Sequence, residues 1–202
     1  MADRGSYHHG DLRESLLDGA LGLLDAEGLE GVSLRAVSRT IGVSHSAPYH
    51  HFSDKAGLVD AMTRRISREL GLLLAGAAQN SVEHLPRVGI TYVCWAVENP
   101  HRFRLLNRRR PGGGTPIPGV TSEASGAYAF DVLLDSMIAG QESGQLAEGD
   151  PNDLAMAAWS AVHGLATLLL DGLLTEGPPT VADAERLATT LTALVGFGLL
   201  RR

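Results

Sequence analysis

The chain has 202 residues, 44% of them hydrophobic and 20% charged, and this composition excludes a wholly disordered polypeptide. A net charge of −6 argues against a protein that coats nucleic acid through a dense basic surface, although a small module could still place a few cations on phosphates. The single cysteine excludes an internal disulfide. No secretion signal is visible, and the longest apolar stretches are too short to span a bilayer. We therefore expect a soluble cytoplasmic protein.

A first helix is predicted over residues 11–27. Its apolar residues recur every three or four positions and form one stripe, and Gly28 is a suitable residue to end the helix. The stripe consists of Leu12, Leu16, Leu17, Ala20, Leu23 and Leu24.

Two short helices joined by a tight turn are predicted next. Ser33 can cap the first of them, which extends to Ile41, and Gly42 allows the positive φ angle of the turn. The second is predicted over residues 45–51, with Pro48 in its first turn, where a missing N–H is tolerated. This is the plan of a DNA-binding helix-turn-helix, in which the first helix supports the second and the second enters the major groove.

The second short helix offers hydrogen-bonding side chains to a DNA duplex. Phe52 is expected to fill the core beneath this helix, with His51 packed inward beside it. Ser44 is also a suitable cap for the helix. The residues expected to contact phosphates and base edges are Ser44, His45, Ser46, Tyr49 and His50.

A lysine stands at the start of the following helix. Ser53 or Asp54 caps this helix, and Lys55 in its first turn is the only lysine among the 17 basic residues of the chain. A cation at this position opposes the helix dipole. The arrangement makes sense if Lys55 and the helix N-terminus together hold a phosphate.

Residues 11–58 resemble the N-terminal domain of the TetR/AcrR family of bacterial regulators. Some members of that family also share the lead-in Tyr-His-His-Gly-Asp-Leu, which occupies residues 7–12 here. The motifs that carry the resemblance, in order and at the family's spacing, are residues 31–35, residues 41–44, residues 49–52, Lys55 and Leu58.

The resemblance implies a DNA-binding domain over residues 1–54 and a helical ligand-binding and dimerisation domain over residues 55–202. It also implies that Ser33 and one of two exposed arginines contact the DNA backbone, and we assign Arg35 rather than Arg39 to that role. The usual member of the family is a repressor that a small molecule releases from its operator.

The rest of the chain is also predicted to be helical, so the fold class is all-α. Residues 108–119 are rich in Arg, Gly and Pro and are expected to form a solvated loop. Proline or glycine separates most of the other segments. The predicted helices span residues 55–79, 82–98, 101–107, 122 or 123 to 143, 150 or 151 to 174, and 181–200.

The last two helices are apolar around much of their circumference, which exceeds what one core needs. We expect them to form a four-helix bundle with the same helices of a second copy, giving a two-fold homodimer. The apolar residues are Leu154, Met156, Ala157, Ala158, Ala161, Leu165, Leu168, Leu169, Leu187, Leu191, Leu194, Val195 and Leu199.

A ligand pocket is predicted in the C-terminal half, where residues 159–164 resemble the tryptophan and histidine-glycine signature of one TetR subgroup. Trp159 and His163 are four residues apart and therefore lie on the same side of a helix. Each candidate could equally be an ordinary core residue. The candidates are Tyr92, Trp95, Phe103, Phe130, Met137, Trp159 and His163.

Two other functions compete with a ligand-responsive regulator. Cys94 with a histidine could form a nucleophile pair, but it lies in an apolar helical stretch and no known catalytic motif accompanies it. A helical adaptor that no longer binds DNA would not need Tyr49 or Lys55.

The pair His8 and His9 lacks further ligands nearby, so we expect no metal and no cofactor.

Overall fold

The structure is a computed structural model, and it describes residues 9–78, 84–108 and 127–199. Within these ranges the regular elements are all helices, which confirms the predicted all-α class. The chain divides into two compact units, residues 1–65 and 66–202. Helix α3 (Lys55–Ala78) belongs to both, because Arg65 ties its first part to α1 through a 2.8 Å ion pair with Glu14. The sequence predicted the division at the start of α3, between residues 54 and 55. The two compact units divide about three turns farther along this helix.

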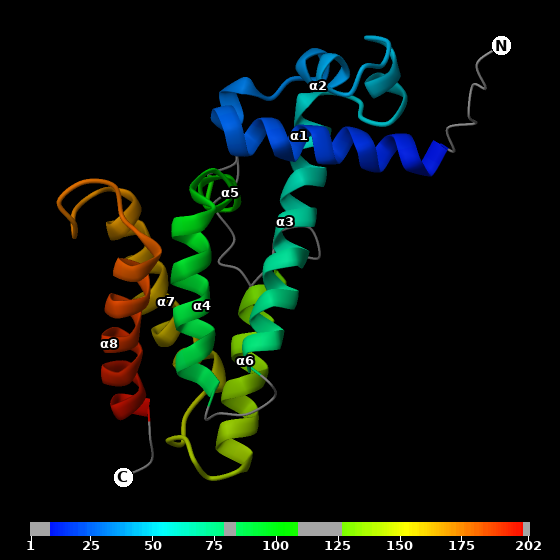
Figure 1. Ribbon diagram of the computed structural model, residues 1–202. Helices are drawn as coiled ribbons and strands as arrows, with labels where there is room; N and C mark the ends of the chain where they lie inside the picture. Colours follow the sequence, from blue (N-terminus) through cyan, green and yellow to red (C-terminus); the bar gives the residue numbers. More distant parts are fainter. Residues whose placement is uncertain (1–8, 79–83, 109–126, 200–202) are drawn as a thin grey trace. The chain divides into compact units, whose positions relative to one another are not determined.

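The N-terminal unit contains α1 (His9–Gly31), α2 (Leu34–Thr40), a single 3-10 turn η1 (Ala47–His50) and the start of α3 (Figure 1). Gly28 interrupts α1 with a φ of 71°, as expected of the residue that ends the apolar stripe. Ser33 caps α2, because its hydroxyl accepts the Ala36 N–H at 3.1 Å. The core includes Leu16, Leu17, Ala20, Leu24, Val32, Val37, Phe52, Leu58 and Met62.

The second short helix is shorter than predicted. The sequence predicted a helix over residues 45–51, whereas the structure has only η1, preceded by a turn. Pro48 has no N–H to donate to the Ser44 carbonyl, and the backbone instead forms tighter bonds from Ala47 to Ser44 and from Tyr49 to Ser46, both 3.1 Å. The Ser44 hydroxyl bonds to the Ser46 hydroxyl at 3.2 Å and caps no helix.

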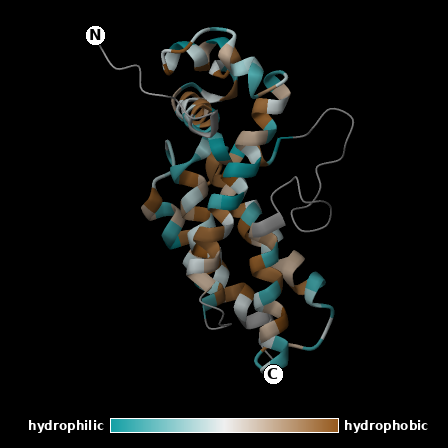
Figure 2. Cartoon of the chain, turned by 90° about the vertical axis from the view of Figure 1, so that its right-hand side faces the viewer, coloured by the Kyte–Doolittle hydropathy of each residue, from teal (hydrophilic) through white to brown (hydrophobic). Residues whose placement is uncertain are grey.

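Helix α4 (Leu85–Glu98) lies at the centre of the C-terminal unit. It packs against α6 (Ala127–Glu142), α7 (Pro151–Leu170) and α8 (Val181–Leu199), and the short α5 (Pro100–Leu106) follows it (Figure 1). Hydrophobic residues occupy much of the length of these helices (Figure 2).

The predicted ends of these helices hold with one exception. Asp150 caps α7, accepting the Asn152 N–H at 2.8 Å, but α7 ends at Leu170 rather than at residue 174 because Gly172 adopts a φ of 71°. The predicted starts of α4 and α6 and most of the 108–119 loop lie outside the described residues.

A glycine allows α4 to approach its neighbours closely. A Cβ atom on Gly89 would lie 2.7 Å from Thr192 Cγ2 on α8 and 3.0 Å from Val162 Cγ1 on α7. Helices with larger residues at such a crossing stand farther apart. Gly89 therefore fixes how near α4 lies to α7 and α8.

Several apolar side chains of the C-terminal unit remain exposed in the single chain. Leu168 on α7 is 42% exposed and Leu194 on α8 is 66% exposed. Leu73 on α3 is 45% exposed, whereas its neighbours Leu70 and Leu74 are buried. Among the described helices, α7 alone is long and apolar enough to cross a membrane, a property that core helices also show.

Candidate nucleic-acid interface and ligand cavity

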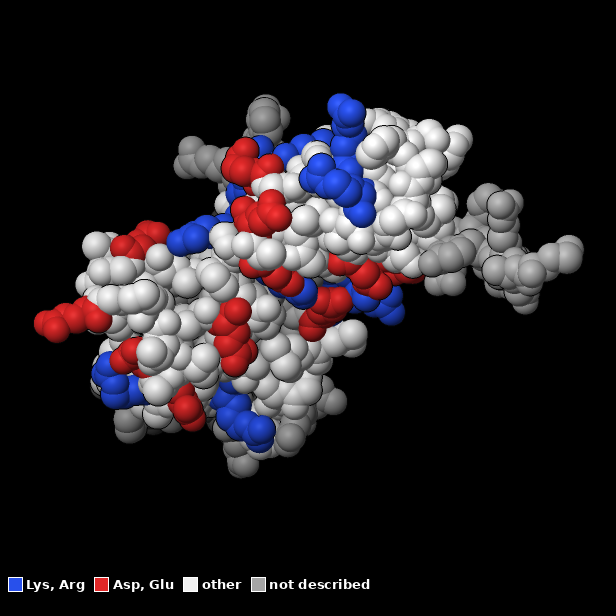
Figure 3. Space-filling model, turned by 45° about the horizontal axis from the view of Figure 1, so that its top comes forward, with Lys and Arg blue, Asp and Glu red and all other residues white. Residues whose placement is uncertain are grey.

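The helix-turn-helix region presents polar side chains above a buried apolar base. Pro48 and Phe52 are buried, whereas Tyr49 is 55% exposed. Figure 3 shows Lys and Arg side chains gathered on the N-terminal unit beside an area without charge. Of the predicted DNA contacts, those that lie on the exposed surface are Arg35, Ser44, His45, Ser46, Tyr49, His50 and Lys55.

Ser38 on α2, which the sequence analysis did not single out, connects α2 to His45 of the exposed helix-turn-helix surface. Ser38 is fully buried and donates its hydroxyl hydrogen to the Arg35 carbonyl at 3.0 Å. A hydroxyl has only one hydrogen, so the 3.1 Å contact between Ser38 Oγ and His45 Nδ1 requires His45 to donate. In the tautomer that carries its hydrogen on Nδ1, the Nε2 atom has no hydrogen and can accept one. The sequence signal that could have indicated this role is a serine, Ser38, at a position of α2 that faces the core.

The start of α3 is capped by an acidic residue next to Lys55. Asp54 accepts the Gly57 N–H at 2.8 Å, which confirms one of the two predicted caps. The Asp54 carboxylate occupies the position at which a helix N-terminus would hold an anion. The Lys55 ammonium donates one hydrogen bond to the Leu29 carbonyl at 3.2 Å and carries two further N–H groups. Any phosphate at this place would therefore be held by the side chain of Lys55.

The remaining predicted contact and its neighbours have structural roles as well. Ser33 is half-buried and its oxygen is used in the α2 cap, which leaves its hydroxyl hydrogen to donate. His51 is half-buried beside Phe52. The guanidinium of Arg13 lies 5.3 Å from the centre of the Phe52 ring and covers the edge of the small core.

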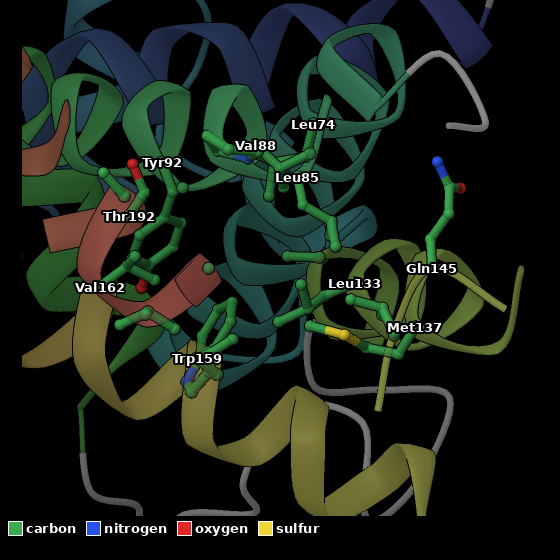
Figure 4. A pocket seen from close by; sticks show the side chains of 18 of the residues that line it. Leu74, Leu85, Val88, Tyr92, Leu133, Met137, Gln145, Trp159, Val162 and Thr192 are labelled. Carbon is green, nitrogen blue, oxygen red and sulfur yellow. The ribbon is translucent and has the colours of Figure 1, made fainter. Parts of the chain in front are cut away.

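The C-terminal unit contains a cavity of about 530 Å³ (Figure 4). Of the seven predicted lining residues, Tyr92, Met137 and Trp159 line it. The other sixteen lining residues were not predicted: Leu74, Leu85, Pro86, Val88, Gly89, Ala129, Leu133, Gly144, Gln145, Leu146, Ala158, Val162, Thr192, Ala193, Val195 and Gly196.

The other four predicted residues lie outside the cavity wall. Phe103 and Phe130 are buried, and Phe130 meets Trp159 edge-on with ring centres 6.2 Å apart. His163 stacks on Phe103 at 5.4 Å and on Trp159 at 5.9 Å. Trp95 is buried on α4. Most of these aromatic residues therefore form a cluster that supports the wall.

Tyr92 connects this cluster to the cavity. Its hydroxyl lies 2.9 Å from His163 Nδ1. Burial raises the pKa of Tyr92 and lowers the pKa of His163, so both side chains are neutral near pH 7 and the hydrogen bond joins two uncharged groups. Protonation of His163 at Nδ1 would make the ring the donor and the Tyr92 oxygen the acceptor.

Acidification is expected to destabilise the protein through His163. Because burial lowers the pKa of His163, the unfolded chain binds a proton on this residue at a higher pH than the folded chain does. The stability contribution is complete above about pH 6.5 and is lost as the pH falls below it, since the unfolded state then holds more protons. Urea unfolding between pH 8 and pH 5 measures this loss.

Two variants assign the effect to His163. His163→Asn should show a flatter pH dependence than the wild type, whereas His50→Asn, which removes an exposed imidazole, should keep the wild-type slope. Parallel curves for the wild type and His163→Asn would contradict the assignment.

Cys94 does not have the surroundings of a catalytic thiol. It is half-buried, and its pKa is raised by burial and then by the carboxylates of Glu185 and Glu98. A raised pKa disfavours the thiolate, which is the nucleophilic form. Cys94 also lies outside the residues that line the cavity.

Comparison with known families identifies the class of protein. Residues 16–62 match the family model described as bacterial regulatory proteins, tetR family. Residues 85–195, more than half of the chain, match the model described as tetracyclin repressor-like, C-terminal domain. The chain belongs to the TetR family and is a DNA-binding transcriptional regulator with a helix-turn-helix domain and a helical C-terminal domain.

Individual relatives agree with this assignment. The chain is 23% identical over 192 residues to the uncharacterised HTH-type transcriptional regulator Rv0681 of Mycobacterium tuberculosis, covering 94% of this chain and 82% of that one. A protein of unknown function from Rhodococcus sp. RHA1 has a similar structure, with a TM-score of 0.80, 28% identity and coverage of 98% and 100%. SmeT, the repressor of a Stenotrophomonas maltophilia multidrug efflux pump, has a TM-score of 0.65, 20% identity and coverage of 94% and 90%.

Proposed function

We propose that this protein is a homodimeric repressor that binds paired operator half-sites and leaves them when a small molecule enters the cavity. The observation that carries the proposal is the extent of α3, which runs from the helix-turn-helix to the cavity wall. This one helix has Lys55 at its start, among the exposed residues of the helix-turn-helix unit, and Leu74 in the wall of the cavity. A ligand that moves Leu74 acts on the same continuous helix that carries Lys55.

The proposed DNA contacts follow from exposure and chemistry. Tyr49 and Lys55 would hold phosphates through a phenol O–H and an ammonium group, with Ser33 and Arg35 as further backbone contacts. Ser44, His45, Ser46 and His50 would face base edges or phosphates in the major groove. The Ser38 hydrogen bond presets the ring of His45 for this role, since its Nε2 can accept from a base amino group.

The proposed dimer uses the outer faces of α7 and α8. Ala157, Ala161, Leu165 and Leu168 lie on one face of α7, at spacings of three and four residues, and are exposed or half-exposed in the single chain. Leu187, Leu191 and Leu194 form the matching face of α8. Only 28% of the most apolar stretch of α7 is buried within one chain. A second copy covers this surface better than a membrane does, because a DNA-binding regulator acts in the cytoplasm.

The sense of regulation is proposed from the family and from SmeT, whose structure is that of a repressor of a multidrug efflux pump. Ligand binding would change the separation or orientation of the two helix-turn-helix units of the dimer. Half-sites one helical turn apart require both units to fit at once, so a small change weakens both contacts together.

Operator selection tests the proposal. The purified protein is mixed with sheared DNA of the genome that encodes it, and the retained fragments are sequenced. We expect enriched fragments to share an inverted repeat whose half-sites lie about 10 base pairs, or a multiple of that, apart. Retention without any shared sequence would contradict a role as a specific regulator.

A further inference from the structure

We infer that the molecule bound in the cavity is uncharged and largely apolar. The inference deepens the proposed function, since it names the chemical class of the effector that the cavity takes. It depends on the composition of the cavity wall, on the state of its polar groups and on its volume.

The first observation is the absence of charge. Among the described residues that line the cavity, none is Lys, Arg, His, Asp or Glu. A carboxylate, phosphate or ammonium group placed inside would lose its hydration without gaining an ion pair, which costs several kcal/mol in real proteins. A charged ligand is therefore selected against, and a neutral one is not.

The walls offer apolar and aromatic contacts on several sides. Val88 and Tyr92 come from α4, Leu133 and Met137 from α6, and Trp159 from α7 (Figure 4). The indole of Trp159 and the ring of Tyr92 lie 4.8 Å apart between centres and form a continuous aromatic surface. Aromatic rings and a flexible methionine suit a ligand with a ring system.

Two hydroxyl groups of the wall already have partners inside the protein. Tyr92 bonds to His163, and the Thr192 hydroxyl donates to the Ala188 carbonyl at 2.8 Å. Two buried side-chain atoms among the described residues have no hydrogen-bond partner, Ser67 Oγ and His84 Nδ1, and neither residue lines the cavity. These two hydroxyls therefore do not require a polar ligand to satisfy them.

One exposed polar group marks where a polar atom of the ligand would fit. The Gln145 side chain is exposed at the edge of the cavity, and its oxygen accepts the Ser143 hydroxyl at 2.9 Å. Its amide NH₂ can donate to a hydroxyl or carbonyl oxygen on the ligand. A volume of about 530 Å³ lies within the range of sites for drug-sized molecules.

A matched set of probes tests the inference. The full-length protein is loaded with Nile red, a neutral dye that fluoresces in apolar sites, and the dye is displaced by naphthalene probes. Naphthalene-1-methanol, 1-naphthoate and 1-naphthylmethylammonium share one ring system and differ in charge. We expect the neutral alcohol to displace the dye at a concentration at least about tenfold lower than either charged probe, because only the charged probes pay for desolvation without a partner.

A pair of glycine variants assigns the displacement to the cavity. Gly196 lines the cavity on α8 and has open space where a Cβ would lie, so Gly196→Leu fills the cavity without a clash at the backbone. Gly76 on α3 also has open space but does not line the cavity. Gly196→Leu should lose most dye and probe binding, whereas Gly76→Leu should bind both like the wild type. Both changes favour the helix, so neither should unfold it.

The outcomes separate this inference from the proposed function. Equal or tighter binding of a charged probe, or unchanged binding by Gly196→Leu, would overturn the inference whatever happens to DNA binding. Selective binding of the neutral probe supports it. If the neutral probe binds but neither it nor the cavity-filling leucine changes operator affinity, the class of ligand stands and the proposed release mechanism fails.

Discussion

Replacing Leu194 with glutamate is expected to separate the dimer into single chains and to weaken operator binding by about 100- to 10,000-fold. Leu194 is 66% exposed in the single chain, so the change does not disturb the core of one subunit. In the proposed four-helix bundle it places a charge against an apolar face, where no partner can neutralise it. Without the dimer, the two helix-turn-helix units bind their half-sites independently and the gain from simultaneous binding is lost.

Sedimentation and fluorescence anisotropy with operator DNA measure the two effects. Leu168→Glu on the facing part of the apolar surface should behave like Leu194→Glu. Leu72→Glu is the matched control, because Leu72 is 67% exposed on α3 and lies outside α7 and α8. A Leu194→Glu protein that remains a dimer, with unchanged helix content, would show that the subunits meet elsewhere.

Loss of the Lys55 ammonium is expected to produce the second large effect. In a dimer, Lys55→Ala removes two proposed phosphate contacts, each contributing about 1 kcal/mol, so operator affinity should fall by about 30-fold. Binding should weaken to a similar extent on operator and on unrelated DNA, because phosphate contacts carry no sequence information. The slope of log K against log salt concentration should decrease in magnitude by about two.

Tyr49→Phe provides a finer test of the same surface. It keeps the ring, which is 55% exposed, and removes only the hydroxyl, so a smaller loss of affinity is expected. Arg87→Ala removes one positive charge from an exposed position on α4 in the other unit and should leave both affinity and salt slope nearly unchanged. If Lys55→Ala binds the operator with the wild-type salt slope, Lys55 does not contact a phosphate.

The sequence predicted most of the N-terminal unit because its signals are local. Caps at Ser33 and Asp54 and the turn glycine Gly42, with a φ of 73°, each depend on a few neighbouring residues. The helix over residues 45–51 was predicted too long because a proline tolerated in a first turn can also limit a short segment to a 3-10 turn. The bond from His45 to Ser38 joins two elements, and spacing alone does not show it.

The cavity was harder to predict because it depends on how helices pack. Tyr92, Met137 and Trp159 were found because large side chains on apolar helices often line pockets. Phe103 and Phe130 are also large side chains on apolar helices, but they pack against His163 and Trp159 and do not line the cavity. Gly196 lines the cavity because of where the backbone of α8 lies, and the sequence alone does not indicate that position.

The contact of α4 with α7 and α8 at Gly89 has a consequence for how new specificities can arise in this protein. Side-chain exchange cannot bring these backbones closer together, and a larger residue there would force Thr192 and Val162 aside. Leu133 and Met137 on α6, by contrast, can be shortened or lengthened along the opposite wall. Mutational libraries that seek a sensor for a different molecule should therefore vary α6 and leave the glycine untouched.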